Sequence, residues 1–304
     1  MPCRPSTRRY DGHLTSATWG ARCGKSARRV LRGGTGTSDL VARPVPTHHS
    51  VQHSLLLEKV ARRVHDASVM RLLKMILKST GAKGVPQGGV ISPMLSNLYL
   101  TEVDRMLEKA IATTRRGKYP NVQYARFADD LVVLIDSHPR HEWLMGAVEK
   151  RLREEMTKLR VEINEEKSRN VDLSTGGSFG FLGFEYRRIR SRKRKWRAQY
   201  EPKLKKRTAL LQKLKEIFQR YVSQPVGRVI ELINPILRGW VHYFAVGDSS
   251  RCFSYIKLWV EKKVRRHLMR ARKRTGFGWQ RWSTQWLYTT FGLFNAYRVV
   301  RAIS

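Results

Sequence analysis

Two adjacent carboxylates, Asp129 and Asp130, are the residues of this 304-residue chain whose types and position best suit chemistry. Runs rich in β-branched and aromatic residues flank them, at 123–126 and 131–135, and Asp is frequent in turns. The pattern predicts a β-hairpin with Phe127-Ala128-Asp129-Asp130 at its tip. Paired carboxylates supply the oxygen ligands that Mg²⁺ prefers, and metal-assisted phosphoryl transfer uses such ligands. Most Asp-Asp pairs are solvated turns. This pair is a stronger candidate for metal binding because apolar strands flank it and because the chain is strongly basic.

A second candidate segment is the turn Pro86-Gln87-Gly88-Gly89, which precedes a predicted helix. Glycine lets a backbone approach a substrate closely, and glutamine can hydrogen-bond a sugar or a base. We expect Ser92 to cap this helix and Pro93 to occupy its first position. Lys167 follows a short strand expected at 160–163, and it could neutralise pyrophosphate or donate a proton. Taken alone, a helix-leading turn and a solvated lysine are the simpler interpretations of these residues.

The charge of the chain indicates a polyanionic partner. Lys and Arg total 60 and Asp and Glu total 24, which gives a formal net charge of +36. Nucleic acid is the first candidate and an anionic membrane surface the second. The sequence has no apolar run long enough to span a bilayer and no signal peptide. Its three cysteines, Cys3, Cys23 and Cys252, fit neither a disulfide framework nor a zinc site, so we expect a reducing, cytoplasmic setting. Because of the charge, we also expect the protein to be in contact with nucleic acid there.

The chain divides by composition and periodicity. Residues 1–47 are rich in Arg, Ser, Thr, Gly and Pro without helical or strand periodicity, and we expect them to be disordered. Two amphipathic helical pieces follow between residues 54 and 77, interrupted near Asp66, and a further helix is expected at 143–159. Beyond a basic linker at 187–202 the pattern is helical to residue 304. The sequence thus predicts an α+β part followed by an all-helical part.

Basic residues with one tryptophan form a candidate RNA-binding segment. Eight of the eleven residues at 187–197 are basic and none is acidic. Cations suit phosphate contacts, and Trp196 suits base stacking; a nuclear-targeting run or a solvated tail would also explain such a segment. The candidate RNA-binding residues are Arg187, Arg188, Arg192, Lys193, Arg194, Lys195, Trp196, Arg197, Lys205, Lys206 and Arg207.

Four motifs occur in an order that resembles group II intron-encoded reverse transcriptases. They are residues 84–93, the hairpin tip 127–130, residues 163–167 and residues 181–184. Residues 233–244, Ile-Asn-Pro-Ile-Leu-Arg-Gly-Trp-Val-His-Tyr-Phe, resemble the maturase domain of the same family. The similarity covers residues 48–304.

This resemblance implies a partial reverse-transcriptase palm without fingers at 48–186 and an all-helical thumb and maturase domain at 203–304. It implies RNA-directed DNA polymerisation in retrohoming, with Asp129 and Asp130 as catalytic Mg²⁺ ligands, and intron RNA binding that assists splicing. It also implies partners: intron RNA, an RNA template, a DNA primer or target, and deoxynucleoside triphosphates; a homodimer stays open. The residues that it implies at the nucleotide and template site are Pro86, Gln87, Gly88, Gly89 and Lys167.

The N-terminal part departs from the family. Residues 1–47 resemble none of its motifs, and His49 stands where the resemblance places a third carboxylate. A neutral imidazole is a poor ligand for Mg²⁺, which prefers oxygen. We therefore expect an N-terminally truncated or frame-disrupted member with little or no polymerase activity. Three interpretations stay open: a reverse transcriptase with maturase activity, an RNA-binding maturase without polymerase activity, and an inactive remnant.

Overall fold

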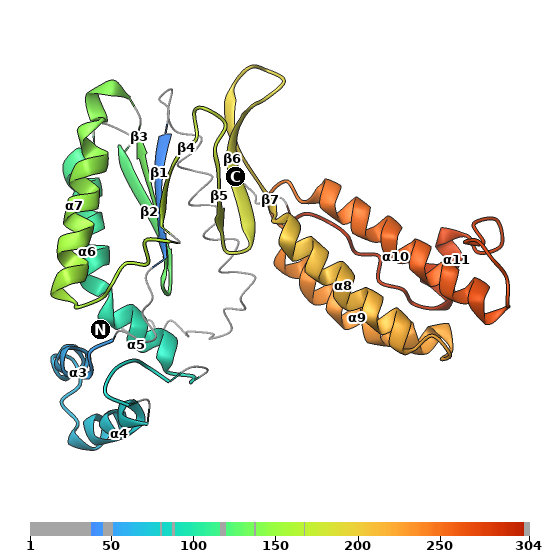
Figure 1. Cartoon of the computed structure of the whole chain (residues 1–304), viewed down its shortest axis with the longest axis horizontal. Coiled ribbons are helices and arrows are strands. Elements are labelled where there is room, and N and C mark those ends of the chain that lie inside the picture. Colours follow the sequence, from blue (N-terminus) through green and yellow to red (C-terminus); the bar gives the residue numbers. More distant parts are fainter. Residues whose placement is uncertain are drawn as a thin grey trace, which may run out of the picture. The chain divides into compact units, whose positions relative to one another are not determined.

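The computed structural model describes residues 38–44, 51–79, 81–86, 89–115, 120–136, 138–166 and 168–300. These residues form two compact units (Figure 1). The α/β unit comprises described residues 38–181 and 185–199, and the helical unit comprises 182–184 and 200–300. Among the described residues, no helix is long and apolar enough to cross a membrane.

The α/β unit is built on a four-stranded sheet with the order β2-β3-β1-β4. All three pairs of neighbouring strands are antiparallel. Helices α6 and α7 pack against each other, and they contact β2 and β1 respectively (Figure 1). The elements are β1 (Ser38–Pro44), α3 (His53–Ala61), α4 (Ala67–Lys78), α5 (Ser92–Tyr99), α6 (Thr101–Thr114), β2 (Val122–Phe127), β3 (Asp130–Asp136), η1 (Pro139–His141), α7 (Trp143–Lys158) and β4 (Arg169–Asp172).

Strand β1 corrects the expectation that no regular element precedes residue 48. It lies between β3 and β4 and pairs with both, from Ser38 opposite Asp136 to Pro44 opposite Asp130. A seven-residue strand gives a weak local pattern, and pairing along both edges is a tertiary effect that propensity does not report. The other residues of the segment 1–47 lie outside the described part of the chain.

Helices α3 and α4 confirm the two predicted helical pieces. Asp66 caps α4, because its side chain accepts hydrogen bonds from the backbone nitrogens of Ser68 and Val69 at 2.7 and 3.0 Å. Helix α7 is also confirmed, but the strand expected at 160–163 is not formed. Arg160 takes a φ of +52° directly after the helix, and such a left-handed residue ends a helix without starting a strand.

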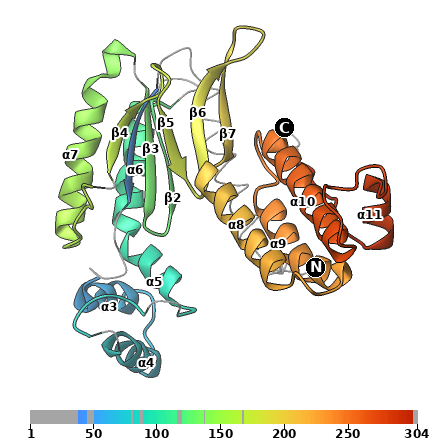
Figure 2. The ribbon, with the colours of Figure 1, turned by 45° about the vertical axis from the view of Figure 1, so that its right-hand side comes forward.

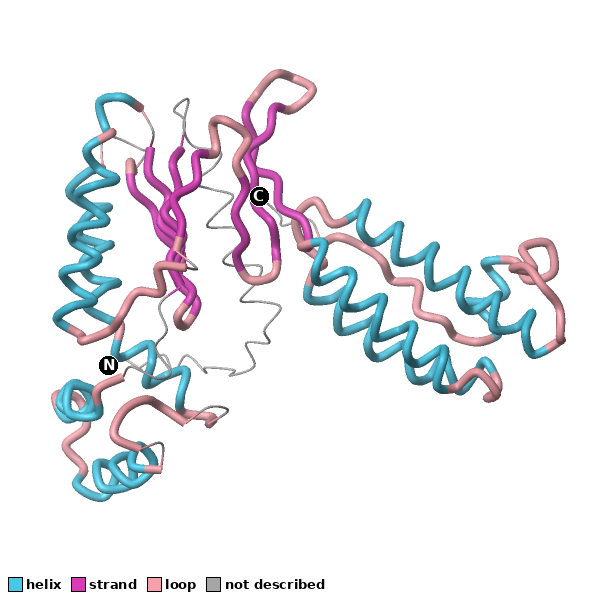
Figure 3. The backbone as a smooth tube through the Cα atoms, viewed as in Figure 1, coloured by secondary structure: helices cyan, strands magenta, loops and turns pink. Residues whose placement is uncertain are grey.

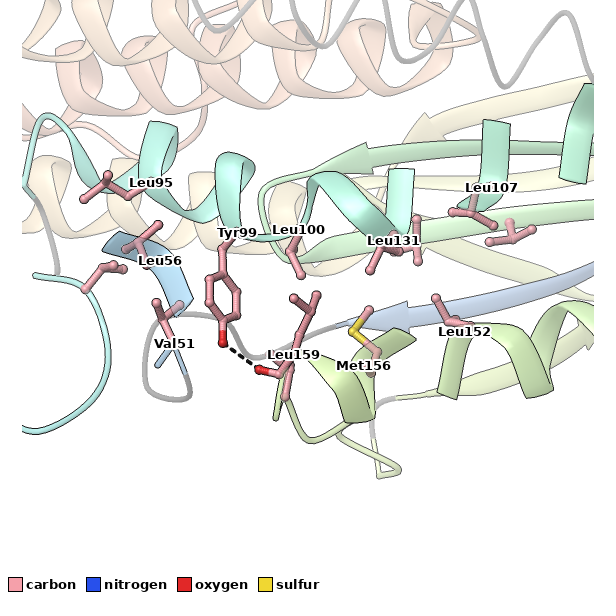
Figure 4. Close-up of a cluster of buried hydrophobic side chains, with 14 of the residues drawn as sticks. Val51, Leu56, Leu95, Tyr99, Leu100, Leu107, Leu131, Leu152, Met156 and Leu159 are labelled. Carbon is pink, nitrogen blue, oxygen red and sulfur yellow. Dashed lines mark hydrogen bonds between the residues drawn. The ribbon is translucent and has the colours of Figure 1, made fainter. Parts of the chain in front are cut away.

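The core of the α/β unit joins the segments that carry the motifs. Its buried side chains come from α3, α4, α5, α6, β2, β3 and α7, and Figure 4 draws part of this cluster. Tyr99 is fully buried at its centre: its hydroxyl donates to the Leu159 carbonyl at 2.6 Å and accepts from the Gln52 backbone nitrogen at 3.2 Å. Burial raises the pKa of Tyr99. One phenol thus connects the start of α3, the end of α5 and the end of α7.

A second sheet stands in place of the expected basic linker at 187–202. It has the order β5-β6-β7, and its strands are β5 (Ser178–Phe181), β6 (Phe184–Arg190) and β7 (Trp196–Pro202). Buried and more exposed residues alternate along β6 and β7, with Tyr186 and Ala198 among the buried ones. The sequence hid this period of two because the cations of the two strands and of the turn between them dominate the composition of the segment.

The helical unit consists of α8 (Leu204–Arg220), α9 (Val226–Tyr243), α10 (Ser250–Ala271) and α11 (Thr284–Thr290). Helices α8, α9 and α10 contact one another and run side by side (Figures 2 and 3). Pro235 lies inside α9 and does not end the helix. Leu204 is 61% exposed, and Leu210, Leu214 and Phe218 are the residues of α8 that lie in the core.

Candidate active site

The hairpin of β2 and β3 confirms the predicted presentation of two carboxylates. Phe127 pairs with Asp130, so Ala128 and Asp129 form a two-residue turn. Ala128 has a φ of +51°, a left-handed conformation that costs a non-glycine residue about 1–2 kcal/mol. A positive φ at the first turn position is the pattern of a type II′ turn, which hairpins prefer because it matches their twist. Strain of this kind is typical of functional turns.

The two carboxylates differ in exposure, yet both are accessible. Asp130 is exposed and Asp129 is half-buried, whereas Leu131–Ile135 directly after them are buried. The strand is therefore anchored in the core while its first residue reaches solvent. An ion can bind here without the desolvation cost of a buried charge.

Arg126, the residue two positions before the turn residue Ala128, ties the hairpin to two helices. Its Nε donates to Asp104 Oδ1 of α6 at 2.8 Å, and its Nη2 donates to the other carboxylate oxygen. Its Nη1 donates to Asn97 Oδ1 of α5 and to the Ala128 carbonyl oxygen, both at 2.9 Å. No sequence pattern connects residues 97, 104 and 126, and the sequence analysis missed this contact.

The strand beside the turn supplies no further carboxylate there. In the register of β1 with β3, Pro44 lies opposite Asp130, Arg43 opposite Leu131 and Ala42 opposite Val132. Within the described ranges, no group of three or more His, Cys, Asp or Glu could hold a metal ion. His49 lies outside those ranges.

This donor set fits one Mg²⁺ ion. Mg²⁺ is commonly held by one or two carboxylates, with water and substrate phosphates in its remaining positions. Asp129 and Asp130 meet that requirement. A third carboxylate that bridges two ions, as two-metal phosphoryl transfer needs, is not among the described residues near the turn.

The glycine-containing loop before α5 is closed by a serine. Ser92 is buried, and its hydroxyl donates to the Pro86 carbonyl oxygen at 2.6 Å. The expectation that Ser92 caps α5 is therefore wrong: Ile91 is the N-cap and Ser92 is the first helical residue, so Pro93 takes the second position and not the first. A Cβ on Gly89 would lie 2.8 Å from Ser92 Oγ, which explains the glycine at this position. Gln87 and Gly88 lie outside the described residues.

The start of this loop is held to α3. The Gly84 backbone nitrogen donates to the Val51 carbonyl oxygen at 2.8 Å, and His53 Nε2 lies 2.8 Å from the Gly84 carbonyl oxygen. Gly84 has a φ of +95°, which favours glycine. The loop is thus fixed at Gly84 and at Pro86.

Lys167 also lies outside the described residues. Among its described neighbours, the Ser168 backbone nitrogen donates to the Asn164 carbonyl oxygen at 3.0 Å. Arg153 of α7 pairs with Glu165 at 2.7 Å, so the segment before Lys167 is attached to α7.

The basic segment of the α/β unit has an exposed tip and a buried base. Four of its cations are exposed in the turn between β6 and β7, while Arg188 is only 5% exposed. The guanidinium of Arg188 lies 4.5 Å from the Trp196 ring centroid, and that of Arg190 lies 4.9 Å from it. Burial lowers the pKa of Arg188. Arg188 is therefore a packing partner of Trp196 rather than a surface cation, and the exposed tip residues are Arg192, Lys193, Arg194 and Lys195.

The helical unit carries its own cations. Lys205 and Lys206 are exposed at the start of α8, and Arg207 stacks on Tyr255 with its guanidinium 4.5 Å from the ring centroid. Cation–π contacts of this kind hold a guanidinium flat against an aromatic ring. Lys205 and Lys206 are therefore exposed to solvent, whereas the guanidinium of Arg207 is held against an aromatic ring.

Helix α10 has a cation cluster that the sequence analysis did not single out. Lys262 lies 4.6 Å from the Phe277 ring centroid and Lys263 lies 5.1 Å from that of Trp259. Partial burial, Arg266 and other nearby cations lower the pKa of Lys263. Like charges that repel one another in the free protein are relieved when phosphates approach. The density of Lys and Arg within this predicted helix was the available signal.

Two family comparisons cover most of the chain. The family described as "Reverse transcriptase (RNA-dependent DNA polymerase)" matches residues 46–186. The family described as "Group II intron, maturase-specific domain" matches residues 207–286. Both ranges agree with the regions on which the sequence resemblance rested, and reverse transcriptase domains use divalent metal ions.

Two individual proteins are similar to the chain over part of their length. The chain is 31% identical to Protein YkfC of Escherichia coli (strain K12) over 176 residues, 47% of this chain and 45% of that protein, so it spans less than half of that relative. A solved structure of apo telomerase from Candida tropicalis is similar with a TM-score of 0.42 and 14% identity, over 56% of this chain and 35% of the telomerase chain. The chain thus combines a reverse transcriptase domain at residues 46–186 with a group II intron maturase-specific domain at residues 207–286.

Proposed function

We propose that this chain binds intron RNA and assists its splicing, and that it has little or no polymerase activity. The observation that carries the RNA-binding role is the cation cluster of α10, defined as Lys262, Lys263 and Arg266, inside the maturase-specific match. Burial and then the nearby cations Arg266, Lys215 and Arg270 lower the pKa of Lys263, and polyanion binding relieves the repulsion among these cations.

A comparison of two triple variants tests this role. We predict that Lys262→Gln, Lys263→Gln and Arg266→Gln together lower the affinity for a group II intron RNA on the order of 10- to 100-fold, because three phosphate contacts are lost. The matched control replaces Arg71, Lys74 and Lys78, which are exposed on α4, and removes the same charge. Filter binding at one fixed salt concentration measures both; equal losses in the two variants would contradict the assignment.

RNA-directed DNA polymerisation is the second candidate, favoured by the Asp129–Asp130 turn. In this proposal both carboxylates hold Mg²⁺, which acts as a Lewis acid on the attacking hydroxyl and the phosphates when bound. Pro86, Gln87, Gly88 and Gly89 shape the nucleotide and template site, and Lys167 lies near the incoming deoxynucleoside triphosphate. The chain itself holds these segments in place. The hydrogen bond from Arg126 to Ala128 fixes the turn, and the hydrogen bond from Ser92 to Pro86 fixes the loop.

Primer extension separates the two candidates. Since β1 presents Ala42, Arg43 and Pro44 beside the turn, we predict little or no Mg²⁺-dependent extension of a DNA primer on an RNA template. The control is Asp129→Ala, whose background should equal that of the unaltered chain. Robust extension that Asp129→Ala abolishes would contradict the prediction and establish the polymerase.

Other partners follow from the same proposal. A DNA target and retrohoming belong to the polymerase candidate, whereas intron RNA belongs to both. The RNA-bound role implies an intracellular protein, and sedimentation of the chain with and without RNA decides whether it forms a homodimer.

A further inference from the structure

The carbonyl oxygen of Ala128 belongs to the central peptide of the candidate metal-binding turn. This peptide joins Ala128 to Asp129, so its rotation changes the direction in which the Asp129 side chain leaves the backbone. Ala128 holds a φ of +51°, which a non-glycine residue keeps only where its surroundings impose it. The hydrogen bond from Arg126 Nη1 to this oxygen, at 2.9 Å, is such a constraint.

Asp104 determines where Arg126 points. The guanidinium is planar, and two of its nitrogens are engaged by the two oxygens of Asp104. With Nε and Nη2 fixed, Nη1 is left facing Asn97 and Ala128. The side chain of Arg126 is 9% exposed and that of Asp104 is 22% exposed, so water competes little for these hydrogen bonds.

We propose that Arg126 and Asp104 are positioning residues that hold the Ala128–Asp129 peptide in the orientation required for binding a divalent cation. This inference rests on the proposed role of Asp129 and Asp130 as ligands. Neither Arg126 nor Asp104 touches the ion; they act through the backbone of the turn. Asn97 extends the same network to α5, the helix that follows the Pro86–Gly89 loop, and so couples the loop to the turn.

Arg126→Lys is the decisive variant. Lysine keeps the positive charge but loses the planar group that binds Asp104 and the Ala128 carbonyl together. We expect it to weaken Mn²⁺ binding at the turn on the order of 10- to 100-fold, as does the loss of other partners that orient metal ligands. Mn²⁺ stands in for Mg²⁺ because electron paramagnetic resonance counts the free ion directly.

The matched control is Arg105→Lys. Arg105 lies on α6 next to Asp104, and it pairs with Glu102 at 3.1 Å on an exposed part of the helix. This variant makes the same chemical change without reaching the turn, so we expect unchanged Mn²⁺ affinity. Thermal unfolding of both variants, followed by circular dichroism, confirms that the chains are folded at the temperature of the titration.

The outcomes are distinct. Mn²⁺ binding that depends on Asp129 and falls in Arg126→Lys but not in Arg105→Lys supports the inference. Wild-type affinity in a folded Arg126→Lys overturns the inference and leaves the ligand assignment intact, because a purely structural role would alter only the unfolding temperature. Wild-type binding that Asp129→Ala does not change overturns the ligand assignment, and the positioning role with it.

Discussion

Asp129 and Asp130 combine a fixed backbone with accessible oxygen atoms. The buried run from Leu131 to Ile135 anchors them on one side, and the hydrogen bond from Arg126 to Ala128 holds the turn on the other. At the scale of single residues, the site therefore depends as much on the residues that hold the turn in place as on its two carboxylates. Tyr99 has a comparable role in the core of the α/β unit, because its hydroxyl forms hydrogen bonds with two backbone groups.

Replacing Tyr99 tests that role. We predict that Tyr99→Phe lowers the free energy of unfolding by about 1–3 kcal/mol, because the Leu159 carbonyl and the Gln52 nitrogen lose their buried partner. Tyr255→Phe removes a hydroxyl from a ring that is 48% exposed, and we expect a change within about 0.5 kcal/mol. Urea unfolding measures both. A loss in Tyr99→Phe no larger than in Tyr255→Phe would show that these bonds contribute nothing.

At the scale of elements, strong periodicity decided what the sequence could predict. The hairpin of β2 and β3, the pair α3 and α4, and α7 all carry apolar residues at the spacing of their own element, and all were predicted. Strand β1 was missed because partners on both sides, not its own residues, define it. The second half of β6 and strand β7 were mistaken for a linker because the cations in them and in the turn between them dominate the composition.

The candidate site shows the same limit. Asp129 and Asp130 were predicted because they are adjacent and flanked by strands. The contacts of Arg126 join residues 97, 104, 126 and 128 from three elements and a turn, and only the folded chain brings these residues together. Ser92 was assigned to a helix cap on local grounds, whereas its hydroxyl reaches back across the loop to Pro86. Local rules find ligands more readily than the residues that orient them.

At the scale of the whole molecule, charge is the dominant property. The chain has a net charge of +36, and both described units carry exposed cations, at the β6–β7 turn and along α8 and α10. Each phosphate contact releases counterions from the RNA, so affinity falls as salt rises. A chain with this charge that binds RNA through its maturase region must therefore show a steep salt dependence.

The most direct test is the affinity of the full chain for a group II intron RNA, measured from about 50 to 200 mM monovalent salt, the range over which several phosphate contacts become visible. We predict a loss of affinity of roughly 1,000-fold or more over that range, the effect expected for six or more phosphate contacts. An affinity that barely changes with salt, or the absence of binding at the lowest salt concentration, would contradict the RNA-binding function.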